Sequence, residues 1–236
     1  MRSLHTFVSI AASTLLITAA SAANASGIDV QFSNGGVPAQ TGAAVTGAAG
    51  DVWNVVTGGT GSQVALKGTD GTSSGVSLSF SSAQQYESDA GYTQFTGTPY
   101  ASLMQGYLVD RGATGIDLSF SGLVAGQAYG LYVYTQGDDN SARRSIGFTV
   151  NGVAAGSTTQ SNATTFIAGD NYEYIVTTAN AQGVIGLDGD VVDGEGNVNG
   201  VQLSALAVPE PSSIAMMLAG LAGLAGLAGI ASRRSR

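Results

Sequence analysis

The sequence contains no cysteine, and its single histidine is His5, close to the amino terminus. Without cysteine the chain can form no disulfide, no thiolate zinc site and no cysteine nucleophile. Because no histidine follows His5, the rest of the chain cannot supply a histidine base, a serine–histidine triad or a histidine metal ligand. A folded domain in this chain must therefore be stabilised by a packed core.

Basic residues are also scarce, with eight lysines and arginines against 16 aspartates and glutamates. Over residues 26–212 only Lys67, Arg111, Arg143 and Arg144 are basic, against all 16 acidic residues, which gives this part a net charge of −12. Such a protein repels phosphate backbones, so we expect no nucleic-acid partner. The same acidity favours solubility outside the cell and can attract divalent cations.

The amino-terminal residues have the pattern of a secretory signal peptide. Arg2 is followed by an apolar stretch from Phe7 to Ala20 and then by Ala23-Asn24-Ala25, which fits an A-x-A cleavage site. We therefore expect a signal peptide over residues 1–25 and a mature chain that starts at Ser26. Cleavage after Ala22 and an uncleaved amino-terminal anchor are the alternatives.

The central part of the chain has no long hydrophobic run. Apolar and polar residues instead alternate there over short stretches. Glycine pairs and Asn-Gly or Asp-Gly turns separate these runs, and no stretch keeps a helical period of 3.6. The pattern predicts one all-β domain over residues 26–206, an antiparallel β-sandwich of the jelly-roll type, with long loops at 37–50 and 84–99. The predicted strands are 28–32, 51–56, 63–66, 76–80, 104–109, 115–120, 128–135, 145–150, 164–168, 173–178, 183–187 and 200–206.

Proline is rare as well, yet two of the four prolines enclose one glutamate in the triplet Pro209-Glu210-Pro211. Two prolines exclude a helix through these residues and hold the backbone extended, as the groove of a protease requires.

An uncharged apolar run follows the triplet from Ser213 to Ala231. About 19 residues at a helical rise span about 28 Å, close to the thickness of a bilayer core, so the run predicts a transmembrane helix over 213–231. Arg233, Arg234 and Arg236 then place the carboxyl terminus in the cytoplasm and everything upstream outside it.

These three elements in this order resemble the PEP-CTERM sorting signal of Gram-negative bacteria, here residues 207–236. The resemblance implies recognition by an exosortase, a membrane-embedded cysteine protease or transpeptidase that processes its substrates near the triplet. It also implies a transient stay in the inner membrane, then delivery to the cell surface or extracellular matrix. A plain carboxyl-terminal anchor with a proline linker is the alternative.

The second half of the domain resembles the galactose-binding-like and carbohydrate-binding jelly-rolls of exported bacterial proteins. The resemblance implies a sandwich fold and suggests sugar binding. Its strand-and-turn runs are 115–123, 126–134, 148–152 and 198–203.

Aromatic residues are the candidates for a sugar site, because sugar C–H faces pack on aromatic rings. Along 129–134, Tyr129, Leu131 and Val133 share one face of the predicted strand, and Tyr132 and Tyr134 share the other. The aliphatic pair marks the first face as the core. Tyr132 and Tyr134 then lie on the opposite face, exposed or under a loop, and are the candidate glycan-binding residues.

Acidic residues are densest between Asp188 and Asn199, where Asp188, Asp190, Asp193 and Glu195 are candidate calcium ligands. The spacing departs from a helical calcium loop, whose twelfth position would require a glutamate where Ser204 stands. The alternative is a solvated acidic turn between the last two strands.

Asp138-Asp139-Asn140 forms a second charged connection with Arg143 and Arg144 close by, where we expect the charges partly to pair with each other. A sugar- or cation-binding loop is the alternative there.

Taken together, these features predict an exported, non-catalytic protein with a structural or adhesive role among exopolysaccharides. A carbohydrate-binding module is the alternative. A polysaccharide hydrolase that uses two carboxylates is a third hypothesis, although no acidic pair is singled out by the sequence.

Overall fold

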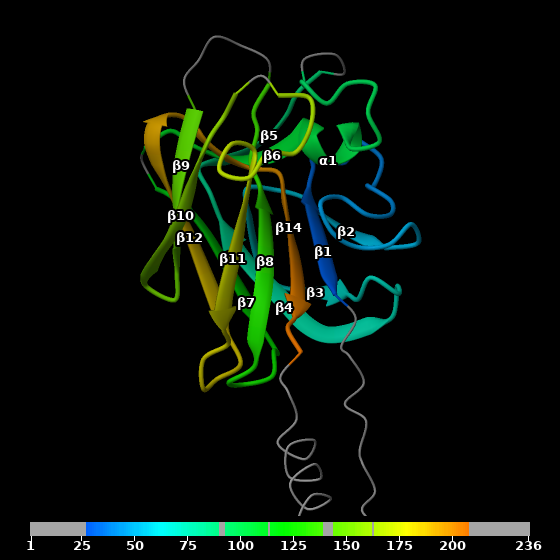
Figure 1. Cartoon of the computed structure of the whole chain (residues 1–236), viewed down its shortest axis with the longest axis vertical. Helices are drawn as coiled ribbons and strands as arrows, with labels where there is room; N and C mark the ends of the chain where they lie inside the picture. The colour runs from blue at the N-terminus through cyan, green and yellow to red at the C-terminus, as the bar shows by residue number, and fades with distance from the viewer. Residues whose placement is uncertain (1–26, 90–92, 113, 139–143, 162, 208–236) are drawn as a thin grey trace, which may run out of the picture.

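A computed structural model describes residues 27–89, 93–112, 114–138, 144–161 and 163–207 (Figure 1). In this part of the chain two β-sheets pack face to face, which confirms the predicted all-β sandwich. The expected signal peptide, the triplet Pro209-Glu210-Pro211, the apolar run 213–231 and the terminal arginines all lie outside the described residues. None of the helical structure in the described ranges has the length and apolar character needed to cross a membrane.

The first sheet has five strands, and the last strand of the domain lies at its centre. All neighbouring strands are antiparallel except β1 and β2, which run parallel. In spatial order the strands are β11 (Tyr172–Thr178), β8 (Ala128–Tyr134), β14 (Gly200–Ala205), β1 (Ile28–Phe32) and β2 (Trp53–Val56).

The second sheet has six antiparallel strands. Along β4, Val76, Leu78 and Phe80 face the core while the intervening serines face outward, as the alternation in the sequence predicts. In spatial order the strands are β10 (Val153–Thr159), β9 (Arg144–Val150), β12 (Ile185–Gly194), β7 (Ile116–Ser121), β4 (Ser73–Ser81) and β3 (Thr60–Lys67).

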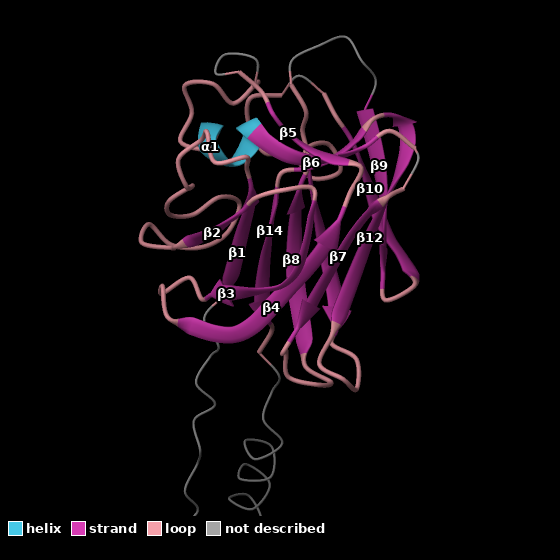
Figure 2. Ribbon diagram, turned by 180° about the vertical axis from the view of Figure 1, so that it is seen from behind, coloured by secondary structure: helices cyan, strands magenta, loops and turns pink. Residues whose placement is uncertain are grey.

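A small third sheet and one short helix lie at one end of the sandwich (Figure 2). The sheet has the order β13 (Gly196–Val198), β6 (Gly106–Asp110) and β5 (Gln84–Glu87), and the helix is α1 (Ala101–Gln105).

Two apolar clusters stabilise the fold. The main core fills the space between the two large sheets and includes Phe32, Leu78, Phe120, Leu131 and Val201. The second cluster lies on the outer face of the five-stranded sheet and consists of Trp53, Phe95, Leu103, Met104 and Tyr134. The part of the outer face around this cluster is therefore covered by loops and not exposed to solvent.

Most predicted strands are present, and the differences follow from local chemistry. Strands β5, β10 and β13 were not predicted, because their short runs are rich in small or polar residues. The predicted strand 164–168 is instead a loop, and its Phe166 packs into the second cluster. The expected acidic turn after residue 187 is also wrong, since β12 continues to Gly194 by pairing with β9.

Candidate functional site

Four tyrosines meet on the outer face of the five-stranded sheet. They come from two Tyr-x-Tyr pairs, one on β8 and one on β11. The antiparallel register sets Tyr174 opposite Tyr132 and Tyr172 opposite Tyr134. Because alternate residues of a strand share a face, all four rings lie on the same side of the sheet.

Tyr132 and Tyr174 form a stacked pair at the open part of this face, and we call these two residues the tyrosine platform. Their ring centroids are 4.5 Å apart with an interplanar angle of 34°. Tyr174 lies over Gly130, where a Cβ would come within 2.9 Å of its ring. Tyr174 is 41% exposed and Tyr132 is partly exposed, so the pair offers an aromatic surface to a ligand.

Tyr132 stays uncharged over the ordinary pH range. Burial raises the pKa of Tyr132, and the neighbouring Tyr174 and Tyr172 raise it further. The Tyr132 hydroxyl group therefore remains a hydrogen-bond donor beside an apolar ring face.

A groove of about 430 Å³ adjoins the platform between the edge strands β10 and β11. Tyr174 lines one side of it, together with Val176. Val153 and Ala154 line the other side. The groove extends the open aromatic surface along the edge of the sandwich.

Tyr134 has a different environment from Tyr132, because loops cover it completely. Its ring lies 5.1 Å from Phe166 and 6.3 Å from Trp53, measured between centroids. Its hydroxyl donates to Gln202 Oε1 at 2.5 Å and accepts from the backbone N–H of Val45 at 3.1 Å. In this structure Tyr134 holds the 37–50 loop against the sheet and presents no face to a sugar.

A buried carboxyl group lies in the same network and was not singled out by the sequence. Asp29 is buried beside Gln202, whose Nε2 donates to its Oδ2 at 3.0 Å. The pKa of Asp29 is raised to about 7, mainly by burial. The hydrogen bond from Gln202 lowers this pKa, and the negative charge of Asp51 raises it. The alternation in β1 placed Asp29 on the polar face, but it gave no sign that a loop covers that face.

Two of the four calcium candidates lie on the outer face of the six-stranded sheet. Asp188 is directly opposite Asp117 of β7, and Asp190 follows on the same face of β12. Burial raises the pKa of Asp188, and the nearby Asp117 and Asp190 raise it further. A groove of about 440 Å³ lies here, lined by Asp117, Asp188 and several small residues, namely Gly61, Ser79, Ser81, Ser119 and Gly186.

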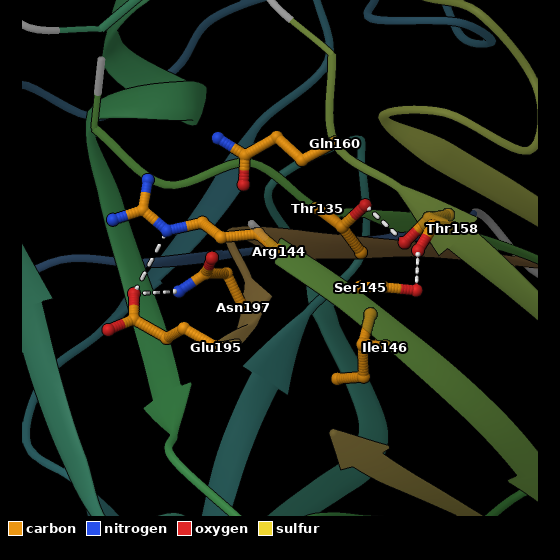
Figure 3. A pocket seen from close by; sticks show the side chains of 8 residues that line it. All are labelled: Thr135, Arg144, Ser145, Ile146, Thr158, Gln160, Glu195 and Asn197. Atoms are coloured by element: carbon orange, nitrogen blue, oxygen red, sulfur yellow. Dashed lines mark hydrogen bonds and ion pairs between the residues drawn. The ribbon is translucent and has the colours of Figure 1, made fainter. Parts of the chain in front are cut away.

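The other two candidates lie elsewhere, and Glu195 is engaged with cations of the protein itself. Its Oε1 lies 3.2 Å from Arg144 Nε, and Asn197 Nδ2 donates to the same oxygen at 3.0 Å (Figure 3). Its Oε2 lies 2.9 Å from Arg111 Nε. Asp193 sits at the irregular end of the β9–β12 ladder. Across the described ranges, no three histidine or acidic side chains converge as a metal site would require.

Arg144 also binds Asp138, as the sequence predicted for this charged connection. Its guanidinium donates to the Asp138 carbonyl oxygen at 2.6 Å and pairs with the Asp138 carboxylate. The pocket beside Arg144 in Figure 3 has a volume of about 10 Å³, which is room for about one water molecule. This cluster therefore joins the loops at one end of the sandwich and leaves no space for a ligand.

Comparison with known protein families gives a match at the carboxyl terminus. The family model of the PEP-CTERM protein-sorting motif matches residues 207–235, which include the Pro-Glu-Pro triplet and the apolar run. The chain carries a PEP-CTERM sorting motif. This motif indicates an exported protein that an exosortase handles at the membrane.

A comparison with curated protein sequences found no match. Among solved structures, the chain is similar to a β-glucuronidase from Bacteroides uniformis, with 16% identity and a TM-score of 0.40 over 56% of this chain and 14% of that one. It is also similar to a family 35 carbohydrate-binding module from Clostridium thermocellum, with 21% identity and a TM-score of 0.33 over 53% of this chain and 90% of that one. A family 35 module from an environmental isolate has 17% identity and a TM-score of 0.30, over 52% and 91% of the two chains.

Proposed function

We propose that this PEP-CTERM protein is a non-catalytic component of the cell surface or extracellular matrix that binds exopolysaccharide there. The sorting motif supports delivery outside the cell. The absence of cysteine, and of histidine beyond His5, argues against most forms of nucleophilic and acid–base catalysis. The role is therefore structural or adhesive, and the sandwich is the part that makes contact with the matrix.

The observation that carries the binding role is the stacking of Tyr132 on Tyr174, with 4.5 Å between centroids, at the open part of a sheet face. Aromatic rings bury much apolar area at little entropic cost, and their hydroxyl groups bond to the rim of a sugar. The adjoining groove between β10 and β11 offers room for further sugar units. The proposed ligand is thus a glycan chain that lies across β11.

The binding role is tested with exopolysaccharide purified from the producing cells. We expect saturable binding by the wild-type protein and a loss of about 5- to 150-fold in Tyr132→Ala and Tyr174→Ala, since each variant removes about 1–3 kcal/mol of aromatic contact. Tyr86→Ala is the matched control, because Tyr86 is similarly exposed and stacks on Tyr107 in the small sheet. Equal binding by all four proteins would contradict the role of the platform.

The sorting role is tested on material recovered from the producing cell. Mass spectrometry should find a carboxyl terminus close to Pro211 in the surface or matrix fraction. A chain without residues 207–236 should fold but remain in the periplasm. Recovery of intact surface chains that end in Arg236 would contradict processing near the triplet, without bearing on the glycan platform.

A further inference from the structure

Both ends of the domain leave the sandwich on the same side. Strand β1 begins where β14 ends, with Ile28 paired to Leu203, and both points lie at the lower end of the molecule in Figure 1. Leu206 is fixed there as well, since its N–H donates to the Ala128 carbonyl at 2.9 Å. We call this side the terminal end, and it consists of the turns at 68–72, 122–127, 151–152 and 179–184.

The terminal end is almost free of charge although the domain is strongly acidic. Three of its turns contain no charged residue, and the fourth contributes Asp70 beside Lys67. The opposite end carries a group of acidic side chains that includes Glu87, Asp110, Asp138, Asp170 and Glu195. Acidic side chains are repelled by an anionic lipid surface, so the terminal end is the side that can approach such a surface with the least repulsion.

Two exposed valines lie in or next to these turns. Val124, in the turn at 122–127, is 65% exposed, and Val153, the first residue of β10 after the turn at 151–152, is 69% exposed. The turn that carries Val124 is held in place, because the N–H of Val124 donates to the Tyr129 hydroxyl at 3.1 Å and the N–H of Gly126 donates to the Ala179 carbonyl at 3.0 Å. The valine side chains are thus offered outward on well-bonded turns, as an interfacial contact requires.

The connection to the expected transmembrane run is short. Six residues lie between Leu206 and Ser213, and even a fully extended chain over these seven Cα–Cα steps spans at most about 25 Å. If the run from 213 crosses the bilayer, the terminal end cannot lie farther than this from the lipid surface. The sandwich is therefore held close to the membrane by the same residues that an exosortase has to reach.

We propose that the terminal end of the sandwich rests on the outer surface of the inner membrane while the chain is anchored there. This inference depends on the proposed anchoring through residues 213–231. Val124 and Val153 contact the lipid headgroup region, and the acidic end points away from the bilayer. The Pro-Glu-Pro triplet is then presented at the membrane surface, where a membrane-embedded protease can cut it.

The test uses the full chain in vesicles of phosphatidylcholine and phosphatidylglycerol. Because the sequence has no cysteine, Val124→Cys and Asn34→Cys each provide a single site for an environment-sensitive fluorophore, at the terminal end and just beyond the far end of β1. Spin-labelled headgroups in the vesicle should quench most of the fluorescence at 124 and little at 34. Equal quenching at both sites in chains that float with the vesicles would overturn the inference.

A matched pair of charge variants completes the test. Val124→Asp places a carboxylate at the proposed contact, and Val192→Asp places one at an equally exposed valine, 65% against 66%, near the far end of β12. With the fluorophore at position 153, Val124→Asp should lower the quenching and Val192→Asp should leave it unchanged. If the wild-type chain does not float with the vesicles, the proposed anchoring is wrong and the inference is wrong with it. If the chain floats but the two variants show the same quenching, only the inference is wrong.

Discussion

The side-chain amide of Gln202 donates a hydrogen bond to the carboxyl group of Asp29 at 3.0 Å, on the covered face of the five-stranded sheet. The same Gln202 accepts a hydrogen bond from Tyr134, whose hydroxyl also binds the 37–50 loop through Val45. An acidic side chain is therefore part of the network that attaches this loop to the sheet. The charge of Asp29 should influence how firmly the loop is held.

Stability should depend on pH through Asp29. Its pKa is about 7 in the folded protein and 3.8 as a free group, so the folded state binds an extra proton between these values. The free energy of unfolding should therefore fall as pH rises from about 4 to about 7 and level off above, by on the order of 4 kcal/mol. Urea unfolding of wild-type and Asp29→Asn proteins over this range measures the effect. Parallel pH curves for the two proteins would contradict it.

The two arginines bound to Glu195 should differ sharply in their contribution to stability. The side chain of Arg144 is 7% exposed and also holds Asp138, while that of Arg111 is 60% exposed. Arg144→Met should lower the free energy of unfolding by about 3 kcal/mol, because it leaves buried acceptors without their cation. Arg111→Met should cost about 0–1 kcal/mol. Similar losses in the two variants, measured by chemical denaturation, would show that burial does not control these ion pairs.

Gly130→Ala should disturb the tyrosine platform without replacing either tyrosine. The added Cβ would lie 2.9 Å from the Tyr174 ring, so the ring must move off its partner Tyr132. We expect a loss of near-ultraviolet circular dichroism from the stacked rings and a cost of about 1–3 kcal/mol in stability. Gly147→Ala is the control, because the nearest atom to its Cβ is a methyl group of Val192 at 3.3 Å. An unchanged spectrum in Gly130→Ala would contradict the geometry of the platform.

Tyr134→Phe should loosen the 37–50 loop while leaving the second cluster filled. It removes one hydroxyl that both donates to Gln202 and accepts from the N–H of Val45. We expect about 1–3 kcal/mol of destabilisation and faster hydrogen exchange at the Val45 amide. Tyr86→Phe is the control, since Tyr86 is partly exposed on the small sheet. Unaltered exchange at Val45 would contradict the role of the hydroxyl.

The alternation of side chains was enough to predict the sandwich and the two faces of β8. Leu131 and Val133 are buried in the main core and Tyr132 lies on the other face, as expected. Strand β10 could not be predicted from the sequence, because an exposed edge strand of small and polar residues has no periodic apolar signal. Phe166 looked like part of a strand, since β-forming residues surround it, but its ring instead fills a loop-covered cluster.

The candidate site was predictable only in part, because it depends on the register between distant strands. Tyr132 was identified from its own strand, whereas its partner Tyr174 lies 42 residues later and meets it only through the pairing of β8 with β11. A second Tyr-x-Tyr pair was the one available signal. The burial of Tyr134 depends on loops whose paths follow no periodic pattern, so sequence alone could not separate it from Tyr132.

The position of β14 also fixes when the protein can fold. This strand is the last of the domain in sequence, yet it lies between β8 and β1 in the middle of the five-stranded sheet. A chain that crosses a membrane from its amino end would have β1 and β8 outside long before the strand that joins them. The five-stranded sheet would stay incomplete until residue 205 emerged from the membrane. The domain would then fold at about the time when its own sorting signal reaches the bilayer.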